Sequence, residues 1–309
     1  MQLLTSAAWV WIPIVVWAAF AQTVRNAAQR TLTAQVGTLP ATLVRFLYGL
    51  PCAALWLALV WQGSDTTGTF PSLHWVYGRW LALGAMAQLG ATALLLMAMK
   101  ERNFIVAVTW SKTEVLQVAL FSVLFLDELP TGLSVVAMVV ATGGVVLLAM
   151  PKPAVGGAKS TGWWSRSALF GLGSGALFAL SAVGYRGAAL AQVGVSPWLA
   201  GAWGVLWAQI LQSLVLGSYL AWRDAGGLIA IARAWRLSLM AGTMGALASA
   251  GWFTAMAMRP AADVRTLGLV EVLFSYLVSR RLFREKLSAP ETWGLVLVTL
   301  GLLAVCAQL

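Results

Sequence analysis

The two halves of this chain match each other without a gap at an offset of 157 residues. The matches include proline, glutamine, arginine and glutamate, and they keep one register from the first predicted helix of each half to the last. Sequences rich in leucine and alanine share some residues by chance, but rarely these types in a single register. The duplication therefore predicts that the second half repeats the elements of the first. The pairs include Gln35 and Gln192, Pro40 and Pro197, Arg79 and Arg236, Arg102 and Arg259, Glu114 and Glu271, and Glu128 and Glu285.

Composition predicts that the repeated elements are membrane-spanning helices. The 309 residues are 60% hydrophobic and only 10% charged, whereas a soluble domain has about 25% charged residues. A helix that crosses a bilayer needs about 20 mostly apolar residues. We therefore expect an all-α polytopic membrane protein, with a first helix that is retained rather than cleaved as a signal peptide. The ten predicted spans are 6–30, 40–61, 79–99, 104–126, 132–150, 166–190, 196–221, 236–257, 264–283 and 289–308.

The number of spans in each half predicts how the halves are related. The segment 151–166 has the Pro, Gly and Ser content of a linker, and it separates a first five-helix repeat (1–150) from a second (167–309). Because five is odd, the second repeat enters the membrane from the side opposite the first. The halves are therefore expected to be inverted repeats, an arrangement that can expose a central site to either face in turn.

The order of several motifs resembles the drug/metabolite transporter superfamily, in particular its EamA-type ten-helix branch. The resemblance covers essentially the whole chain and implies a secondary transporter, often an exporter of small metabolites or toxic compounds, that hydrolyses no ATP. It does not fix the substrate, and an acid at Glu114 is a departure, because family members commonly carry a proline nearby. The motifs are Trp17, Pro40 with Arg45, a polar residue in the middle of the fourth span, Leu126–Leu129, Gly143–Gly144, Phe283–Leu287, Gly294 and Gly301.

Glu114 and Glu271 are the main candidate site residues. A carboxylate at membrane depth is costly and is by default a functional candidate, and its presence in both repeats indicates a transport site between them. Trp110 and Gln117 lie at i−4 and i+3 of Glu114 and share its helix face. The alternative is that both glutamates only form hydrogen bonds that hold the halves together.

Two basic residues occur in one repeat only. Lys112 corresponds to Leu269, and Arg45 corresponds to Ala202. Lys112 lies about 200° around the helix from Glu114, so it needs another carboxylate, a carbonyl or a substrate anion as partner. Arg45 is predicted either to bind an anionic substrate group in a bidentate manner or to form a structural ion pair with Glu114.

Other polar and aromatic residues are candidates for the lining of a central cavity. For Arg25 an interfacial position with the side chain reaching toward the headgroups is an equal alternative, and for the glutamines so is hydrogen bonding between helices. Asp263 is expected to cap the start of the ninth helix, flanked by Arg265, and Gly171 and Gly175 to allow close packing within the chain. The candidate lining residues are Trp17, Arg25, Asn26, Gln88, Tyr185, Arg186 and Gln209.

The distribution of basic residues predicts the orientation in the membrane. The connections after spans 3, 5, 7 and 9 hold twelve Lys and Arg residues, whereas the opposite face, with both termini, holds only Arg79 and Arg259. The positive-inside rule then places both termini outside the cytoplasm of a bacterial inner membrane.

Several classes of function are excluded by what the sequence lacks. The net charge of +10 comes from scattered residues and not from a basic face, so nucleic acid is not an expected partner. The single histidine, His74, cannot form a metal cluster or a catalytic pair with the apolar-span cysteines Cys52 and Cys306, which are not expected to form a disulfide. There is no phosphate-binding loop. We expect no enzyme, no cofactor and no metal.

The leading hypothesis is a proton-coupled exporter of a small organic solute, with an amino-acid-like solute favoured. Burial disfavours ionised carboxyl groups, so both glutamates are expected to exchange protons near neutral pH. Glu114 is expected to lie on the substrate side, and Glu271 to be proton-linked or structural. The alternatives are an uncoupled exchanger of an anionic metabolite and a non-transporting scaffold or sensor. The oligomeric state is open, and a monomer is compatible with the sequence.

Overall fold

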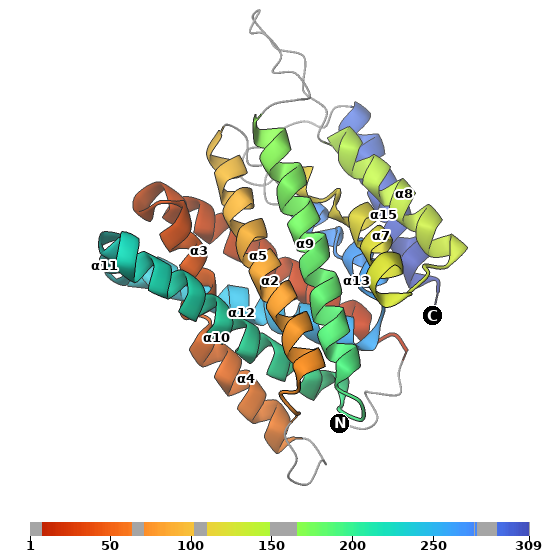
Figure 1. The fold of residues 1–309 in the computed structure, drawn as a ribbon. Coiled ribbons are helices and arrows are strands. Elements are labelled where there is room, and N and C mark those ends of the chain that lie inside the picture. Colours follow the sequence, from red (N-terminus) through yellow and green to blue (C-terminus); the bar gives the residue numbers. More distant parts are fainter. Residues whose placement is uncertain are drawn as a thin grey trace, which may run out of the picture.

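The chain folds as a bundle of helices (Figure 1). The computed structural model describes residues 8–63, 71–101, 110–148, 166–274, 276 and 289–308, and all regular structure within these ranges is helical, which confirms the predicted class. The helices are α2 (Trp11–Val36), α3 (Thr38–Leu47), α4 (Leu50–Gln62), α5 (Trp75–Glu101), α7 (Glu114–Leu126), α8 (Gly132–Leu148), α9 (Arg166–Ala191), α10 (Pro197–Arg223), α11 (Ala225–Arg233), α12 (Trp235–Met258), α13 (Ala261–Leu267) and α15 (Ala289–Cys306).

Five helical stretches of the described residues are long and apolar enough to cross a membrane. They are compatible with an integral membrane protein, because a bilayer core about 30 Å thick requires about 20 residues of helix. Helices α7 and α8 are apolar but shorter. The five stretches are α3 together with α4, residues Trp75–Ala98 of α5, residues Ala168–Ala191 of α9, all of α10, and α15.

Three predicted spans are not continuous helices. Within the second span, α3 and α4 meet at a turn at Tyr48 and Gly49. In the fourth, α7 begins only at Glu114, after a turn at residues 112–113, and in the ninth α13 ends at Leu267, before a turn at residues 268–269. The prediction of uninterrupted helices was therefore wrong at these places. Most of the predicted linker, residues 151–165, and the ninth–tenth connection lie outside the described residues.

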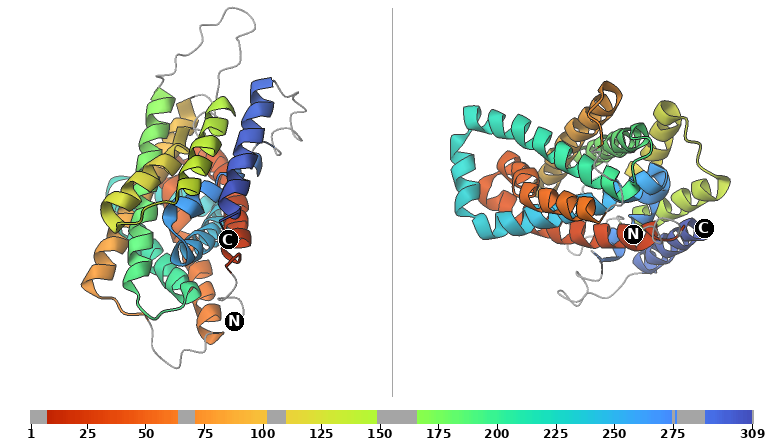
Figure 2. Two further views of the ribbon diagram at one scale, coloured as in Figure 1. Left: turned by 90° about the vertical axis from the view of Figure 1, so that its right-hand side faces the viewer. Right: turned by 90° about the horizontal axis from the view of Figure 1, so that it is seen from below.

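Helices α5 and α9 lie side by side at the front of the bundle in the view of Figure 1. Their backbones approach closely where two glycines meet: a Cβ atom on Gly184 would lie 2.6 Å from the nitrogen of Gly84. The view from below in Figure 2 shows α11 at one end of the molecule and α8 with α15 at the other. Helices α2, α7 and α13 lie between these ends and carry the polar residues described below.

Helices α8 and α15 also pack through glycines. A Cβ atom on Gly144 would lie 2.6 Å from the carbonyl oxygen of Gly294, and one on Gly301 would lie 2.6 Å from the Cβ of Ala141. Small residues at a helix interface allow this approach, and van der Waals contact is a main source of helix association in lipid. The adjacent Gly143 differs, because a Cβ there would meet nothing within 4 Å.

This difference between neighbouring glycines gives a stability test. We expect Gly144→Ala to lower the free energy of unfolding by about 1–3 kcal/mol, because the new methyl group must displace backbone atoms of α15. Gly143→Ala should leave stability unchanged or slightly increase it, since alanine favours helix. Thermal unfolding of the detergent-purified variants measures both. Equal melting temperatures for the two variants would contradict the packing described here.

Candidate functional site

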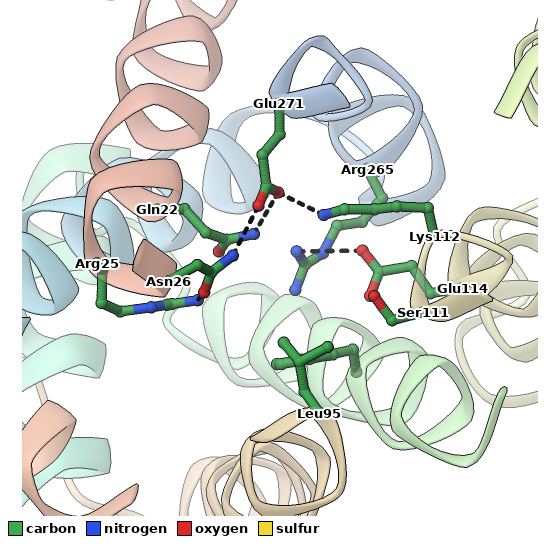
Figure 3. A pocket seen from close by; sticks show the side chains of 10 residues that line it. Gln22, Arg25, Asn26, Leu95, Ser111, Lys112, Glu114, Arg265 and Glu271 are labelled. Atoms are coloured by element: carbon green, nitrogen blue, oxygen red, sulfur yellow. Dashed lines mark hydrogen bonds and ion pairs between the residues drawn. The ribbon is translucent and has the colours of Figure 1, made fainter. Parts of the chain in front are cut away.

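Glu114 and Glu271 line a single pocket in the middle of the bundle (Figure 3). Its walls come from α2, α5, α7, α9, α13 and the two turns that interrupt the fourth and ninth spans. The 157-residue repeat therefore brings its two buried acids to one place. The lining residues are Gln22, Arg25, Asn26, Leu95, Ser111, Lys112, Glu114, Phe178, Arg265 and Glu271.

The two breaks position the carboxylates. The N–H of Val115 bonds to the carbonyl of Lys112 at 3.4 Å, and the N–H of Glu271 bonds to that of Gly268 at 3.1 Å. These bonds join residues three apart, as in a tight 3₁₀ turn. Glu114 is consequently the first residue of α7, and Glu271 is the second residue after its own turn. The start of a helix carries a partial positive charge, which favours a carboxylate there.

Glu271 accepts three hydrogen bonds from buried side chains. Lys112 donates from Nζ and forms an ion pair with it. Gln22 donates from Nε2 at 2.7 Å, and Asn26 donates from Nδ2 at 2.8 Å. Each of these contacts joins residues more than 150 positions apart in the sequence. A buried carboxylate requires such partners, because desolvation of an unpaired charge is very costly.

A second layer fixes the orientation of the two amides. The indole N–H of Trp252 donates to the side-chain oxygen of Gln22 at 3.0 Å, and the guanidinium of Arg25 donates from Nη2 to that of Asn26 at 2.6 Å. Because each amide oxygen is occupied by a donor, each amide NH₂ is left to face Glu271. Trp252 and Arg25 do not bond to Glu271 themselves, but they hold the amides that do in one arrangement.

Glu114 has a less restrained environment than Glu271. Its Oε1 lies 3.5 Å from Nη1 of Arg265, and both side chains are buried. The Arg265 guanidinium also lies over the ring of Trp252, 4.9 Å from its centroid. A 3.5 Å contact is an ion pair but a long hydrogen bond. Of the two acids, Glu114 therefore has the carboxylate that can exchange its partner more easily.

Arg25 has buried donors that lack partners. Its side chain is 1% exposed, and its Nε and Nη1 have no hydrogen-bond partner among the described residues. A buried donor without a partner costs about 1–3 kcal/mol, and more if the group is charged. Arg45 lies close by, since a Cβ on Gly245 would be 3.3 Å from Cδ of Arg25 and 3.2 Å from Cγ of Arg45. The prediction that Arg25 could extend toward the lipid headgroups was wrong.

Arg45 does not form the predicted ion pair with Glu114. It donates from Nη1 to the hydroxyl of Thr92 at 2.8 Å, it does not line the pocket, and the cation beside Glu114 is Arg265. The reason is positional: α3 turns at Tyr48, and Arg45 in its last turn faces α5 and α12 rather than α7.

Three other predicted lining residues, Gln88, Tyr185 and Arg186, lie in separate polar contacts. Gln88 accepts hydrogen bonds from the hydroxyl of Tyr185 and from Gln212, both at 2.9 Å. Arg186 pairs with Glu128 at 2.7 Å and donates to the carbonyl of Met256 at 2.8 Å. These contacts fasten α9 to neighbouring helices and do not line the pocket.

The remaining predicted residues also lie outside the pocket. The amide of Gln209 is buried without a hydrogen-bond partner, against Gly49. Trp17 is 47% exposed and stacks on Phe20, with ring centroids 6.0 Å apart. Trp110 and Gln117 are half-buried and do not line the pocket. Of the predicted residues, the structure brings together Glu114, Glu271, Lys112, Arg25 and Asn26.

Five of the lining residues were not predicted, and two of them, Gln22 and Arg265, contact the acids directly. A signal was present for Gln22. Gln22, Arg25, Asn26 and Gln29 follow each other at i, i+3, i+4 and i+7, so α2 has a polar stripe on one face. Such a stripe in an apolar helix predicts an inward-facing surface, and it would have identified Gln22. Arg265 gave no comparable signal.

Arg265 was overlooked because the predicted start of the ninth helix was misplaced. Helix α13 begins at Ala261 with Pro260 as its N-cap residue, so the predicted capping role of Asp263 was wrong. Asp263 instead accepts a hydrogen bond from the hydroxyl of Ser134 at 2.7 Å. Gly175 does pack closely within the chain, since a Cβ there would lie 2.9 Å from the carbonyl oxygen of Ser111.

The pocket is small and polar. Side chains fill most of it, and the remaining cavity has room for little more than one water molecule. Among the described residues no group of three or more His, Cys, Asp or Glu could hold a metal ion, and Cys52 and Cys306 are free. The arrangement suits binding of a small polar solute once the ion pairs separate.

Comparison with known proteins supports the fold only. No protein-family model matches the sequence, and no curated protein matches it. A solved structure described only as "Crystal structure of protein" is similar, with a TM-score of 0.66, 16% sequence identity, and coverage of 96% of this chain and 96% of that chain. At this identity the likeness shows a common helical architecture.

The contact between Lys112 and Glu271 can be tested by a double-mutant cycle. Removal of one member leaves a buried charge without its partner, which costs about 3–5 kcal/mol. We therefore expect Lys112→Met and Glu271→Gln each to lower the melting temperature strongly. The double variant should be more stable than the sum of the two losses implies. Strictly additive losses would show that the two residues do not interact.

Proposed function

We propose that this chain is a secondary active transporter of the EamA type in the drug/metabolite transporter superfamily. It exports a small organic solute, with an amino-acid-like solute favoured, from a bacterial inner membrane in exchange for protons. Ten spans in two inverted repeats carry the transport, and both termini lie outside the cytoplasm. The single observation that carries this proposal is the meeting of two repeat-related buried carboxylates in one polar pocket.

The positions of the elements support the duplicated architecture. The turns at residues 112–113 and 268–269 correspond to each other within one residue of the 157-residue offset. Glu114 directly follows the first of these turns, and Glu271 follows the second after one residue, Val270. In transporters built from inverted repeats, interrupted helices near the middle of the membrane commonly form the binding site, and their half-helix ends face charged groups.

Glu114 is the proposed exchange residue. Among the described residues, its one ion pair is the long contact to Arg265, so a proton or the ammonium group of a solute can replace that contact at moderate cost. Proton and solute then compete for one carboxylate, which couples inward proton movement to outward solute movement. In this mechanism the proton reaches Glu114 when its contact with Arg265 opens.

Glu271 has the complementary role in this mechanism. Its bonds to Lys112, Gln22 and Asn26 join α2 with the interrupted fourth and ninth spans. The small pocket admits a solute only if these elements move apart, so separation of Lys112 from Glu271 is part of opening. The pair therefore acts as a closure contact between the two repeats.

A second function, exchange of an anionic solute without proton coupling, is favoured by the charge balance. Among the described residues, the buried cations outnumber the buried acids Glu114 and Glu271 by three; they are Arg25, Arg45, Lys112, Arg186 and Arg265. Equal rates of solute exchange with and without a pH gradient would identify this alternative. A scaffold or sensor would move no solute at all.

Transport in proteoliposomes tests the leading proposal. We expect Glu114→Gln to reduce solute accumulation driven by a pH gradient at least tenfold, to the level seen without a gradient. The carboxamide can neither take up nor release the proton that drives transport. The solute for this assay is the compound that most raises the melting temperature of the purified protein in a metabolite screen.

Asp127→Asn is a matched control for charge removal. Asp127 is exposed after α7, and its φ of 54° is one that asparagine also tolerates. This variant should keep full gradient-driven transport. The proton-coupled mechanism is wrong if Glu114→Gln and Glu271→Gln both retain it too.

A further inference from the structure

We propose that the pocket recognises a carboxylate group of its solute and that Arg25 is the residue that binds it. This inference rests on the proposed transport function and adds the chemical class of the substrate. It differs from the sequence-based expectation, which gave the anion-binding role to Arg45 and Lys112.

The pairing of charges around the pocket isolates Arg25. Three cations line the pocket, and two of them have carboxylate partners: Lys112 pairs with Glu271, and Arg265 pairs with Glu114. The one hydrogen bond that Arg25 donates among the described residues is to the neutral amide of Asn26. Arg25 is therefore the pocket cation whose charge no ion pair of the described residues neutralises.

The donors of Arg25 suit a carboxylate. With Nη2 bonded to Asn26, its Nε and Nη1 remain without partners although the side chain is buried. A carboxylate binds a guanidinium either across the two terminal nitrogens or across Nε and one terminal nitrogen. Each mode uses one of the unpartnered nitrogens. A neutral solute offers only single acceptors and leaves the charge without a counter-ion.

The surroundings hold this guanidinium in place for a ligand. Figure 3 shows Arg25 and Asn26 extending from α2 into the pocket opposite Lys112 and Arg265. Gly245 of α12 packs against the stem of Arg25, where a Cβ would lie 3.3 Å from Cδ. The bond to Asn26 links Arg25 to the Glu271 network. A bound carboxylate would thus be in contact with the residues that close the pocket.

The opposite side of the pocket can hold a positively charged part of the same solute. Glu114 has the long contact to Arg265, and it lies across the pocket from Arg25 (Figure 3). A small solute with a carboxylate at one end and an amino group near it satisfies both residues. In this arrangement the cavity has room for little more than one water molecule, so such a solute binds only when the pocket widens.

Binding to the detergent-purified full chain tests the proposal without requiring transport. The probes are alanine with alaninamide and lactate with lactamide, pairs that differ by replacement of the carboxylate with an amide, together with inorganic phosphate. We expect at least one carboxylate to raise the melting temperature in a concentration-dependent manner, and its amide to bind at least tenfold more weakly. Stabilisation by amides as strong as by carboxylates, or by phosphate alone, would overturn the assignment.

Variants of Arg25 separate ligand binding from a structural role. Arg25→Gln should lose at least tenfold in affinity for the carboxylate and Arg25→Lys should lose less, whereas Arg30→Gln, on the exposed side of the same helix, should bind normally. Without ligand, Arg25→Gln should be at least as thermostable as the parent, because it removes an unneutralised buried charge. A destabilised Arg25→Gln, together with no carboxylate response of the parent, would assign the residue a structural role and refute the proposal.

The same data distinguish this inference from the transport proposal. Carboxylate binding that depends on Arg25, in a protein that moves no solute in proteoliposomes, would refute transport and leave the recognition site intact. Transport of solutes without a carboxylate at rates unaffected by Arg25→Gln would refute the recognition site and leave transport intact.

Discussion

The structure depends on the satisfaction of one buried carboxylate. Glu271 lies in the middle of an apolar bundle, where an ionised group without partners is not tolerated. Its three donors come from α2 and from the turn before α7, so the requirement of a single side chain determines how three distant segments meet. Trp252 and Arg25 extend the network by fixing the amides. The ion pair with Lys112 is therefore a structural constraint as well as a feature of the site.

The helix breaks connect this constraint with a site that can change. Bonds between residues three apart replace the usual helical pattern just before Glu114 and Glu271. An interrupted helix places partial charges at membrane depth, and these are tolerated where they face a polar cavity. Gly175 allows α9 to lie against the turn that precedes α7, since a side chain there would collide with the carbonyl of Ser111. The packing at Gly175 brings α9 close to the turn before α7. The partial positive charge at the helix start after each turn then stabilises the carboxylate there.

The sequence contained much of the fold but only part of the site. Hydropathy predicts helices, and the repeat predicts that Glu114 and Glu271 are equivalent, because both signals are local or internal to the sequence. The partner of each acid depends on how helices approach in space. Lys112 is two residues from Glu114 yet pairs with Glu271, and Arg265, predicted to lie at a helix end, pairs with Glu114. A one-dimensional pattern also cannot place the tight turns, since a run of apolar residues looks the same with or without a break.

The charge balance links closure of the pocket to its loading in the proposed cycle. Closing the helices around Arg25 removes water from a cation, and the loss of hydration is costly unless an opposite charge replaces it. Glu271 supplies the opposite charge to Lys112, and Glu114 supplies it to Arg265. In the proposed cycle the carboxylate of the solute supplies it to Arg25. A carboxylate bound at Arg25 therefore lowers the free energy of the closed arrangement relative to the open one. The solute is then a component of the same electrostatic network that holds the bundle together, and its departure favours reopening.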